Sequence, residues 1–183
     1  NARIIGLLQQ LSTQVGALYL QHGNRDFLLG AEFAKAAGLT LLPDPCEIDL
    51  YGRKAIISHG DALCTDDVAY QQFRQMVRNP QWQAQFLAQP LAVRKAIAED
   101  LRRKSEASKQ EKAAAIMDVN ADAVVDLFRR FPDAHDLIHG HTHRPASHTL
   151  DVDGCKRQRW VLQDWYERKS GYLCATETDL AHV

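Results

Sequence analysis

Three short apolar stretches of this sequence each end in a polar side chain that can bind a metal ion, with a glycine close by. The pairs are Gly23 with Asn24, His59 with Gly60, and Gly140 with His141 and His143. Imidazole is the commonest protein ligand for transition metals, and glycine lets the backbone turn sharply beside an ion or phosphate. Because layered α/β sheets bind ligands at the carboxyl ends of their strands, the sequence predicts a metal and phosphate site where these ends meet.

His141 and His143 are separated by one residue, which in an extended segment directs both rings to one side. Two neighbouring ions could then each take one imidazole. We interpret four other histidines as loop or core residues, namely His22, His135, His148 and His182.

The elements that must position these side chains can be predicted from hydrophobic periodicity. Residues 4–15 have the spacing of an amphipathic helix that ends near Gly16, and 17–20 is expected to be a buried strand. A short helix at 30–37 comes next. Strands at 46–50 and 54–58 should form a hairpin around the turn-like residues 51–53.

From Asp67 to Phe131 the pattern is helical almost throughout, with Pro80 and Pro90 expected to separate successive helices. Short apolar runs at 136–138, 149–152, 160–162 and 172–175 predict the closing strands. Helices and strands alternate early and strands cluster late, so the fold class is α/β or α+β with a layered sheet core.

Composition limits the classes of function. The chain has 183 residues, which is enough for one domain core. Its formal net charge is only -1, which gives no electrostatic sign of a nucleic-acid partner. Its four cysteines form no C-x-x-C pair, which favours a reducing cytoplasm. No apolar run is long enough to span a bilayer, and the start resembles neither an initiator nor a signal peptide, so we expect a chain whose front part lies upstream.

Three motifs, Gly23–Asp26, Ser58–Asp61 and Gly140–His143, resemble the later motifs of the calcineurin-like metallophosphoesterases. The likeness is closer still to the branch of this family that hydrolyses the pyrophosphate of UDP-2,3-diacylglucosamine in lipid A biosynthesis. Four longer segments carry this closer likeness, namely His22–Gly30, His59–Asp67, Ile138–Pro145 and Ala115–Asn120. It implies a sandwich of two mixed β-sheets flanked by helices. Residues 1–183 would form a single domain of this kind that lacks the N-terminal part of the fold, with a helical lid insertion at about 67–131.

The resemblance also implies ligands and catalytic groups. Asn24, His59 and His141 would hold one Mn(II) ion and His143 a second, with Asn24, Arg25 and His141 acting on the phosphoryl group. The Asp-x-His and Gly-Asp motifs with which the family pattern opens are absent before Asn24. These motifs supply the carboxylate ligands, so the four ligands present are all neutral and we expect incomplete metal loading.

Substrate contacts follow from the same resemblance, at Asn24, Arg25, Asp67, Ser105, Lys109, Lys112 and His141. Lys109 departs from the smaller polar residue expected there. Apolar and basic side chains coexist between residues 86 and 104, a pattern most often explained by a solvated helix packed on a core. For a lid it also suits acyl chains and an anionic surface, which predicts peripheral attachment to the cytoplasmic face of a Gram-negative inner membrane.

The function implied is Mn(II)-dependent hydrolysis of UDP-2,3-diacylglucosamine to UMP and 2,3-diacylglucosamine 1-phosphate. One alternative is another two-metal phosphodiesterase that acts on nucleotides or nucleic acids. A second is a metal-free scaffold on the same fold. The missing carboxylates favour the scaffold, whereas the retained Asn24, Arg25, His59, His141 and His143 weigh against it.

Overall fold

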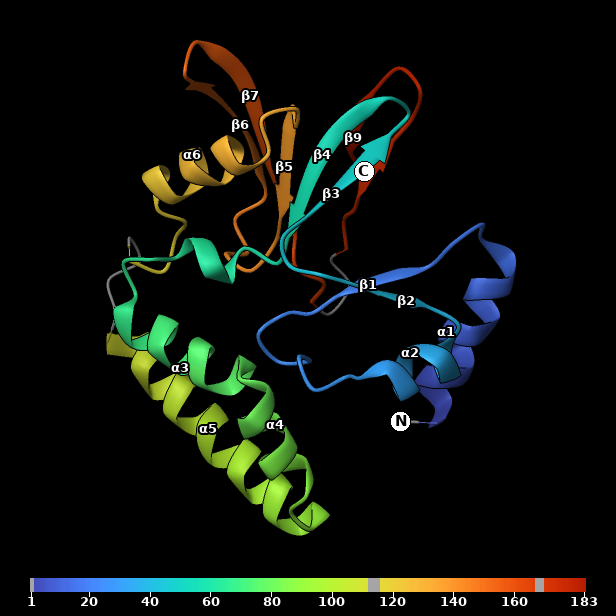
Figure 1. The fold of residues 1–183 in the computed structure, drawn as a ribbon, viewed down its shortest axis with the longest axis vertical. Helices are drawn as coiled ribbons and strands as arrows, with labels where there is room; N and C mark the ends of the chain where they lie inside the picture. Colours follow the sequence, from blue (N-terminus) through green and yellow to red (C-terminus); the bar gives the residue numbers. More distant parts are fainter. Residues whose placement is uncertain (1, 112–115, 167–169) are drawn as a thin grey trace. The chain divides into compact units, whose positions relative to one another are not determined.

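The computed structural model describes residues 2–111, 116–166 and 170–183 (Figure 1). The chain divides into two compact units. The first contains the residues up to Asp61 together with Ala121–Val183, and the second is Ala62–Asn120. Each unit has helices or strands with their own buried residues, so each is described separately.

The first unit begins with helix α1 (Ala2–Gln14). A small βαβ arrangement follows, formed by β1 (Tyr19–Gln21), α2 (Ala31–Ala37) and β2 (Thr40–Leu42). β1 and β2 pair in parallel, with Leu20 opposite Leu41. The predicted helices and strand are present, but the expectation that the strand is buried was wrong, since Tyr19 is 57% exposed. Among the described residues the only strand paired with β1 is β2, which leaves Tyr19 open to solvent.

A five-stranded mixed sheet forms the centre of the first unit. Its strands are β3 (Cys46–Leu50), β4 (Arg53–Ser58), β5 (Asp136–His139), β6 (Ala146–Val152) and β7 (Cys155–Val161), in the order β3-β4-β5-β7-β6. The predicted hairpin is confirmed as β3 and β4. β4 and β5 run parallel with Ser58 opposite His139, so both strands end at the same edge of the sheet.

The two hairpins of this sheet turn through pairs of residues with positive φ. Tyr51 and Gly52 have φ of 56° and 85°, and the Gly52 N–H donates to Asp49 Oδ1 at 2.5 Å. Two-residue turns with both central residues at positive φ match the twist of antiparallel strands, and glycine adopts that conformation without steric cost. Asp153 and Gly154 repeat the geometry between β6 and β7.

Helix α6 (Ala121–Arg130) buries one apolar face in the first unit, and Figure 1 shows it beside β5, β6 and β7. Val124, Leu127 and Phe128 are all buried. Their spacing of three and four residues places them on one side of the helix. Full burial of each such side chain contributes roughly 1.5–3 kcal/mol, so this face is a main source of the unit's stability.

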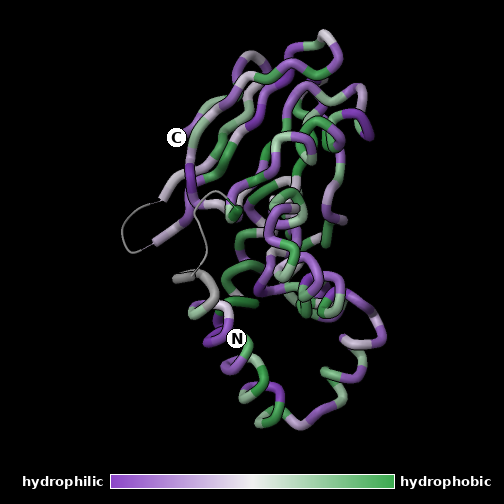
Figure 2. Tube along the Cα trace, turned by 90° about the vertical axis from the view of Figure 1, so that its left-hand side faces the viewer, coloured by the Kyte–Doolittle hydropathy of each residue, from purple (hydrophilic) through white to green (hydrophobic). Residues whose placement is uncertain are grey.

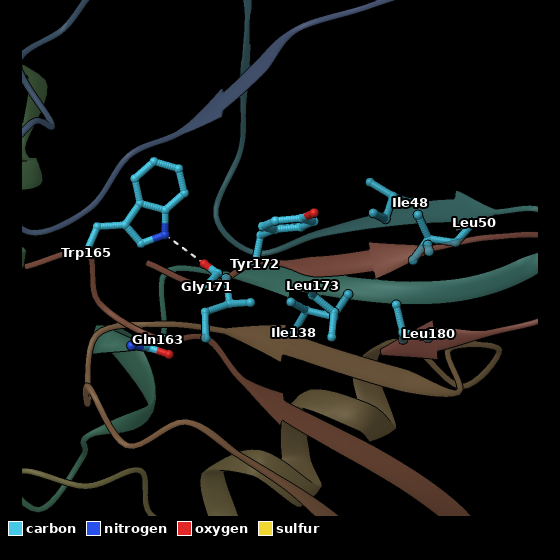
Figure 3. Close-up of a pocket in the computed structure, with 11 residues that line it drawn as sticks. Ile48, Leu50, Ile138, Gln163, Trp165, Gly171, Tyr172, Leu173 and Leu180 are labelled. Carbon is cyan, nitrogen blue, oxygen red and sulfur yellow. Dashed lines mark hydrogen bonds between the residues drawn. The ribbon is translucent and has the colours of Figure 1, made fainter. Parts of the chain in front are cut away.

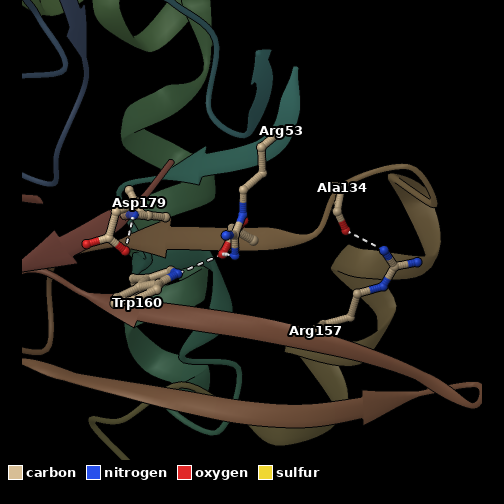
Figure 4. A network of polar contacts seen from close by, with 7 residues as sticks. Arg53, Ala134, Arg157, Trp160 and Asp179 are labelled. Carbon is tan, nitrogen blue, oxygen red and sulfur yellow. Dashed lines mark hydrogen bonds and ion pairs between the residues drawn. The ribbon is translucent and has the colours of Figure 1, made fainter. Parts of the chain in front are cut away.

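A polar network fixes the start of β5 (Figure 4). Asp136 is fully buried and accepts hydrogen bonds from Arg53 Nε, from Arg53 Nη2 at 2.7 Å and from Trp160 Nε1 at 2.7 Å. The bond to Asp136 raises the pKa of Arg53 above its ordinary value. Nearby, Arg157 donates to the carbonyls of Ala134 and Pro132 at 2.8 and 2.7 Å. The buried Asp136 carboxylate is tolerated because the hydrogen bonds from Arg53 and Trp160 satisfy its oxygens.

The C-terminal strands β8 (Leu173–Ala175) and β9 (Leu180–His182) form a hairpin that packs on Ala55 and Ile138 of the sheet. An apolar hollow of about 410 Å³ lies there (Figure 3). Trp165 closes part of its rim by donating from Nε1 to the Gly171 carbonyl at 2.7 Å. None of the predicted site residues lines this hollow.

The second unit is helical, as predicted, with α3 (Val68–Arg78), α4 (Pro80–Leu87) and α5 (Leu91–Glu111). The breaks fall at Pro80 and Pro90, as expected. Asn79 caps α4 through its side chain, which accepts from Gln81 N at 2.8 Å, and Pro80 fits the first turn because it lacks an N–H. The unit ends at Asn120, so α6 belongs to the first unit.

No helix in the described part of the chain is both long enough and apolar enough to cross a membrane. Figure 2 shows hydrophobic and hydrophilic residues interleaved along the chain.

Candidate metal and phosphate site

The site starts from the shared edge of β4 and β5, where His59 follows one strand and Gly140 the other. The Gly140 N–H donates to the His59 carbonyl at 3.1 Å, which extends the strand pairing by one residue. Gly60 then turns away with φ of 103°, a conformation that favours glycine. Parallel pairing therefore places the two histidine-bearing segments side by side.

His59 and His141 are in direct contact. His59 Nε2 lies 3.2 Å from His141 Nδ1, and the rings meet edge to face with centroids 5.0 Å apart. Both side chains are half-buried. Residues 82 positions apart in the sequence thus present two nitrogen atoms to one point.

The turn after β1 reaches the same place. A Cβ atom built on Gly23 would lie 3.0 Å from Cε1 of His59, so only glycine permits this approach without displacing the ring. The Gly23 N–H donates to Asp26 Oδ1 at 2.6 Å, which closes the turn. Asn24 is half-buried and Arg25 is exposed. The structure therefore brings the Asn24 turn, His59 and His141 together.

His143 has a different partner. Its Nδ1 lies 3.1 Å from Oδ2 of Asp164, and its side chain is 61% exposed. The expectation of an extended segment was wrong, because His141 and His143 have φ of 67° and 56°. The Thr142 N–H donates to the Gly140 carbonyl at 2.8 Å, so the segment is a tight turn. The two rings consequently contact different residues.

Sequence reasoning missed the carboxylates that order this site. Asp44 Oδ1 accepts from Ser58 Oγ at 2.7 Å and from the His59 N–H at 3.2 Å, which fixes the backbone that carries the histidine. Burial, with a smaller contribution from the Asp44 charge, raises the pKa of Cys46 above its ordinary value. Asp44 and Asp164 lie in loops without periodicity, so no pattern in the sequence singles them out.

The remaining predicted substrate contacts fall in the second unit or outside the description. Asp67 is buried and caps α3, accepting from the Tyr70 N–H at 3.1 Å, while Ser105 is exposed on α5. Lys109 lies on α5, and Lys112 lies outside the described residues.

The residues present fit part of a metal site. Two nitrogen ligands about 2.1 Å from one ion and at right angles are about 3 Å apart, close to the 3.2 Å between His59 Nε2 and His141 Nδ1. The Thr142 hydroxyl oxygen is buried and has no hydrogen-bond partner in the described structure. Across the described residues, however, no group of three or more His, Cys, Asp or Glu side chains is arranged to hold a metal. The structure brings two imidazoles together beside the Asn24 turn.

These features define a mixed α/β protein with a histidine-bearing site at one sheet edge. No family model matches the chain. It is 58% identical over 149 residues to a UDP-2,3-diacylglucosamine hydrolase of Bordetella pertussis, covering 81% of this chain and 57% of that protein. Proteins of the same name from Cellvibrio japonicus and Aromatoleum aromaticum are 52% and 56% identical. These two matches cover 95% and 82% of this chain, and 72% and 61% of the respective relatives.

The chain belongs to the UDP-2,3-diacylglucosamine hydrolase family. It spans between 57% and 72% of the length of these three curated relatives. The resemblance inferred from the sequence motifs is thereby confirmed at the level of family.

Proposed function

We propose that this chain carries much of a site that hydrolyses the pyrophosphate bond of UDP-2,3-diacylglucosamine, releasing UMP and 2,3-diacylglucosamine 1-phosphate in lipid A biosynthesis. The observation that carries the proposal is the contact between His59 and His141 beside the turn that holds Asn24. The names of the curated relatives support the same reaction.

Two Mn(II) ions complete the proposal. Asn24, His59 and His141 would hold one, and His143 would hold the other. The chemistry that Mn(II) supplies when bound is neutralisation of phosphoryl oxygens and activation of water. The chain's own ligands are all neutral, so they favour softer ions such as Co(II) over Mn(II) when no carboxylate from elsewhere contributes.

Arg25 and Asn24 would contact the phosphoryl group directly. The Arg25 side chain is exposed and follows a residue of the turn that lies against His59. Its planar guanidinium can pair with two oxygens of one phosphate, which a lysine cannot do. His141, as a ligand that faces the same point, is the third catalytic group of the proposal.

The fold proposed for the complete protein is a calcineurin-like sandwich of two mixed sheets, with the helical unit Ala62–Asn120 as a lid. The five-stranded sheet supplies one layer, and the separate compactness of Ala62–Asn120 supports an inserted element. Asp67, Ser105, Lys109 and Lys112 would contact substrate from this insertion.

The substrate's acyl chains place the reaction at a membrane surface. We assign the protein to the cytoplasmic face of the inner membrane as a peripheral component. Exposed apolar residues of α5, among them Leu91, Val93 and Ile97, support this because they alternate with basic residues on a helix without a spanning segment.

The test is UMP release from UDP-2,3-diacylglucosamine by this chain, with Mn(II), with Co(II) and after chelation. The H141A variant should reduce metal-dependent release by about 100-fold or more, since even indirect changes around metal ligands cost about 10- to 100-fold. H148A, which removes an exposed histidine of β6, is the matched control and should retain the activity of the parent.

Three outcomes would count against this proposal. Release that survives both chelation and H141A would mean that the histidine site is not involved. Release from a simple nucleotide diester but not from the acylated sugar nucleotide would favour another phosphodiesterase. Absence of release with any metal, together with absence of metal binding, would favour a metal-free scaffold.

A further inference from the structure

A fully buried histidine lies directly beneath the site. His139 is the last residue of β5 and has no exposed surface. Its Nδ1 lies 2.9 Å from the Gly140 carbonyl oxygen, and its Nε2 lies 3.1 Å from Arg159 Nη1.

The partners of His139 determine its tautomer. Arginine has only donors, so Arg159 must donate to Nε2, and the ring hydrogen must then be on Nδ1 and point to the Gly140 carbonyl. The same carbonyl accepts from the Thr142 N–H at 2.8 Å. Two donors therefore hold the Gly140 carbonyl and fix the peptide unit that leads into His141.

The same Nδ1 edge of the imidazole also lies against the segment that follows His59. A Cβ built on Gly60 would lie 2.8 Å from His139 Nδ1, so the Gly60 backbone rests against the ring. The N–H of Leu162, the residue after β7, donates to the His139 carbonyl at 2.7 Å and anchors that residue. One buried ring thus touches the backbone next to His59 and the backbone next to His141.

We infer that His139 and Arg159 are a positioning pair that sets the separation of His59 and His141. Neither side chain reaches the reacting groups in this assignment. Arg159 orients the His139 ring, and the ring holds Gly60 and Gly140, whose neighbours bear the two imidazoles. The backbone part of this inference stands on geometry alone, and its consequence for metal binding rests on the proposed function.

The first measurement is amide hydrogen exchange of Gly140 without metal, relative to the Ile138 amide of the same strand. H139L and R159M should speed Gly140 exchange relative to Ile138 at least about tenfold, because they release the carbonyl and ring contacts. H139N keeps a donor at the position of Nδ1 and should retain more of the protection. R157M is the matched control, since Arg157 lies two residues away on β7 and bonds Ala134 and Pro132 at the start of β5.

The second measurement is the affinity of the same proteins for Co(II), with H59A to show that binding occurs at the site. H139L and R159M should weaken Co(II) binding by about 10- to 100-fold, and R157M should not. Unchanged exchange at Gly140, or Co(II) affinity within twofold of the parent in both variants, would overturn the positioning role. If Co(II) binding by the parent is insensitive to H59A, the metal proposal fails, and the exchange data alone decide the inference.

Discussion

Backbone conformation explains how two histidines separated by one residue contact different partners. His141 and His143 both have positive φ, so the alternation that holds for extended segments does not apply. Histidine is among the few residue types other than glycine that occupy this region with appreciable frequency. A β-branched residue at either position would add strain, which restricts these two positions beyond their metal chemistry.

Gly60 is predicted to be the glycine of the site least tolerant of substitution. Gly60→Ala should lower the free energy of unfolding by about 2–5 kcal/mol, because a positive φ costs a side chain about 1–2 kcal/mol and overpacking adds about 1–3. The overpacking arises because the new Cβ would lie 2.8 Å from Nδ1 of His139. Urea unfolding measures this change.

Gly52→Ala is the control for strain without crowding. Gly52 has φ of 85° and has no atom within 4 Å of a Cβ built on it, so its substitution should cost only about 1–2 kcal/mol. Equal losses at the two positions would show that Gly60 does not rest against His139.

At the scale of elements, periodicity and punctuation predicted the helices and most strands. Pro80 and Pro90 mark the helix breaks because proline cannot continue a helix, and Tyr51-Gly52 marks a hairpin. The strands β2 and β9, each of three residues, were missed. β7 begins at Cys155, well before the predicted 160, because its first residues are polar and lie in a hairpin rather than in the core.

The sequence predicted the candidate ligands of the site, because each lies close to a glycine at the end of an apolar run. It predicted no other part of the site. The contact between His59 and His141 follows from the parallel pairing of β4 and β5, which the sequence did not specify. The carboxylates of Asp44 and Asp164 come from loops, where position depends on tertiary packing. Their roles could be seen only in three dimensions.

The link between α6 and the β6–β7 turn should depend on pH and salt. Arg129 donates to both carboxylate oxygens of Asp153, at 3.0 and 2.8 Å, and its hydrogen bond lowers the pKa of Asp153. Because the pKa of Asp153 is lowered in the folded state, the ion pair stabilises the fold at pH values above 3.8, the ordinary pKa of aspartate. This stabilisation is lost as the pH falls through the lowered pKa.

Asp153→Asn should therefore lower Tm slightly at pH 7 and have no effect in strong acid. Asparagine tolerates the left-handed φ of 52° at this position, so the turn itself should survive. The difference in Tm should shrink with added salt because both side chains are exposed. Asp151→Asn removes the same charge from the same hairpin and is the control. A difference that persists below pH 2 would exclude the ion pair as its cause.

At the scale of the whole molecule, the chain combines a sheet-based unit and a helical unit, each with its own buried residues. Phe128 is buried in the first and Val77 in the second. Buried apolar contacts largely determine local resistance to opening, and cooperative units often coincide with such clusters. Two clusters in two compact units predict two regions of hydrogen-exchange protection.

Phe128→Ala should lower stability by about 3–5 kcal/mol and speed exchange at amides of β4 and β5, while the amides of α3 keep their protection. Val77→Ala should cost roughly 2 kcal/mol and do the reverse, speeding exchange in α3 and sparing the sheet. Each variant is the control for the other, because both truncate a buried side chain. Exchange that rises equally in both units after either substitution would mean that they unfold together. Separate responses would show that the helical unit can open while the edge that carries His59 and His141 stays formed.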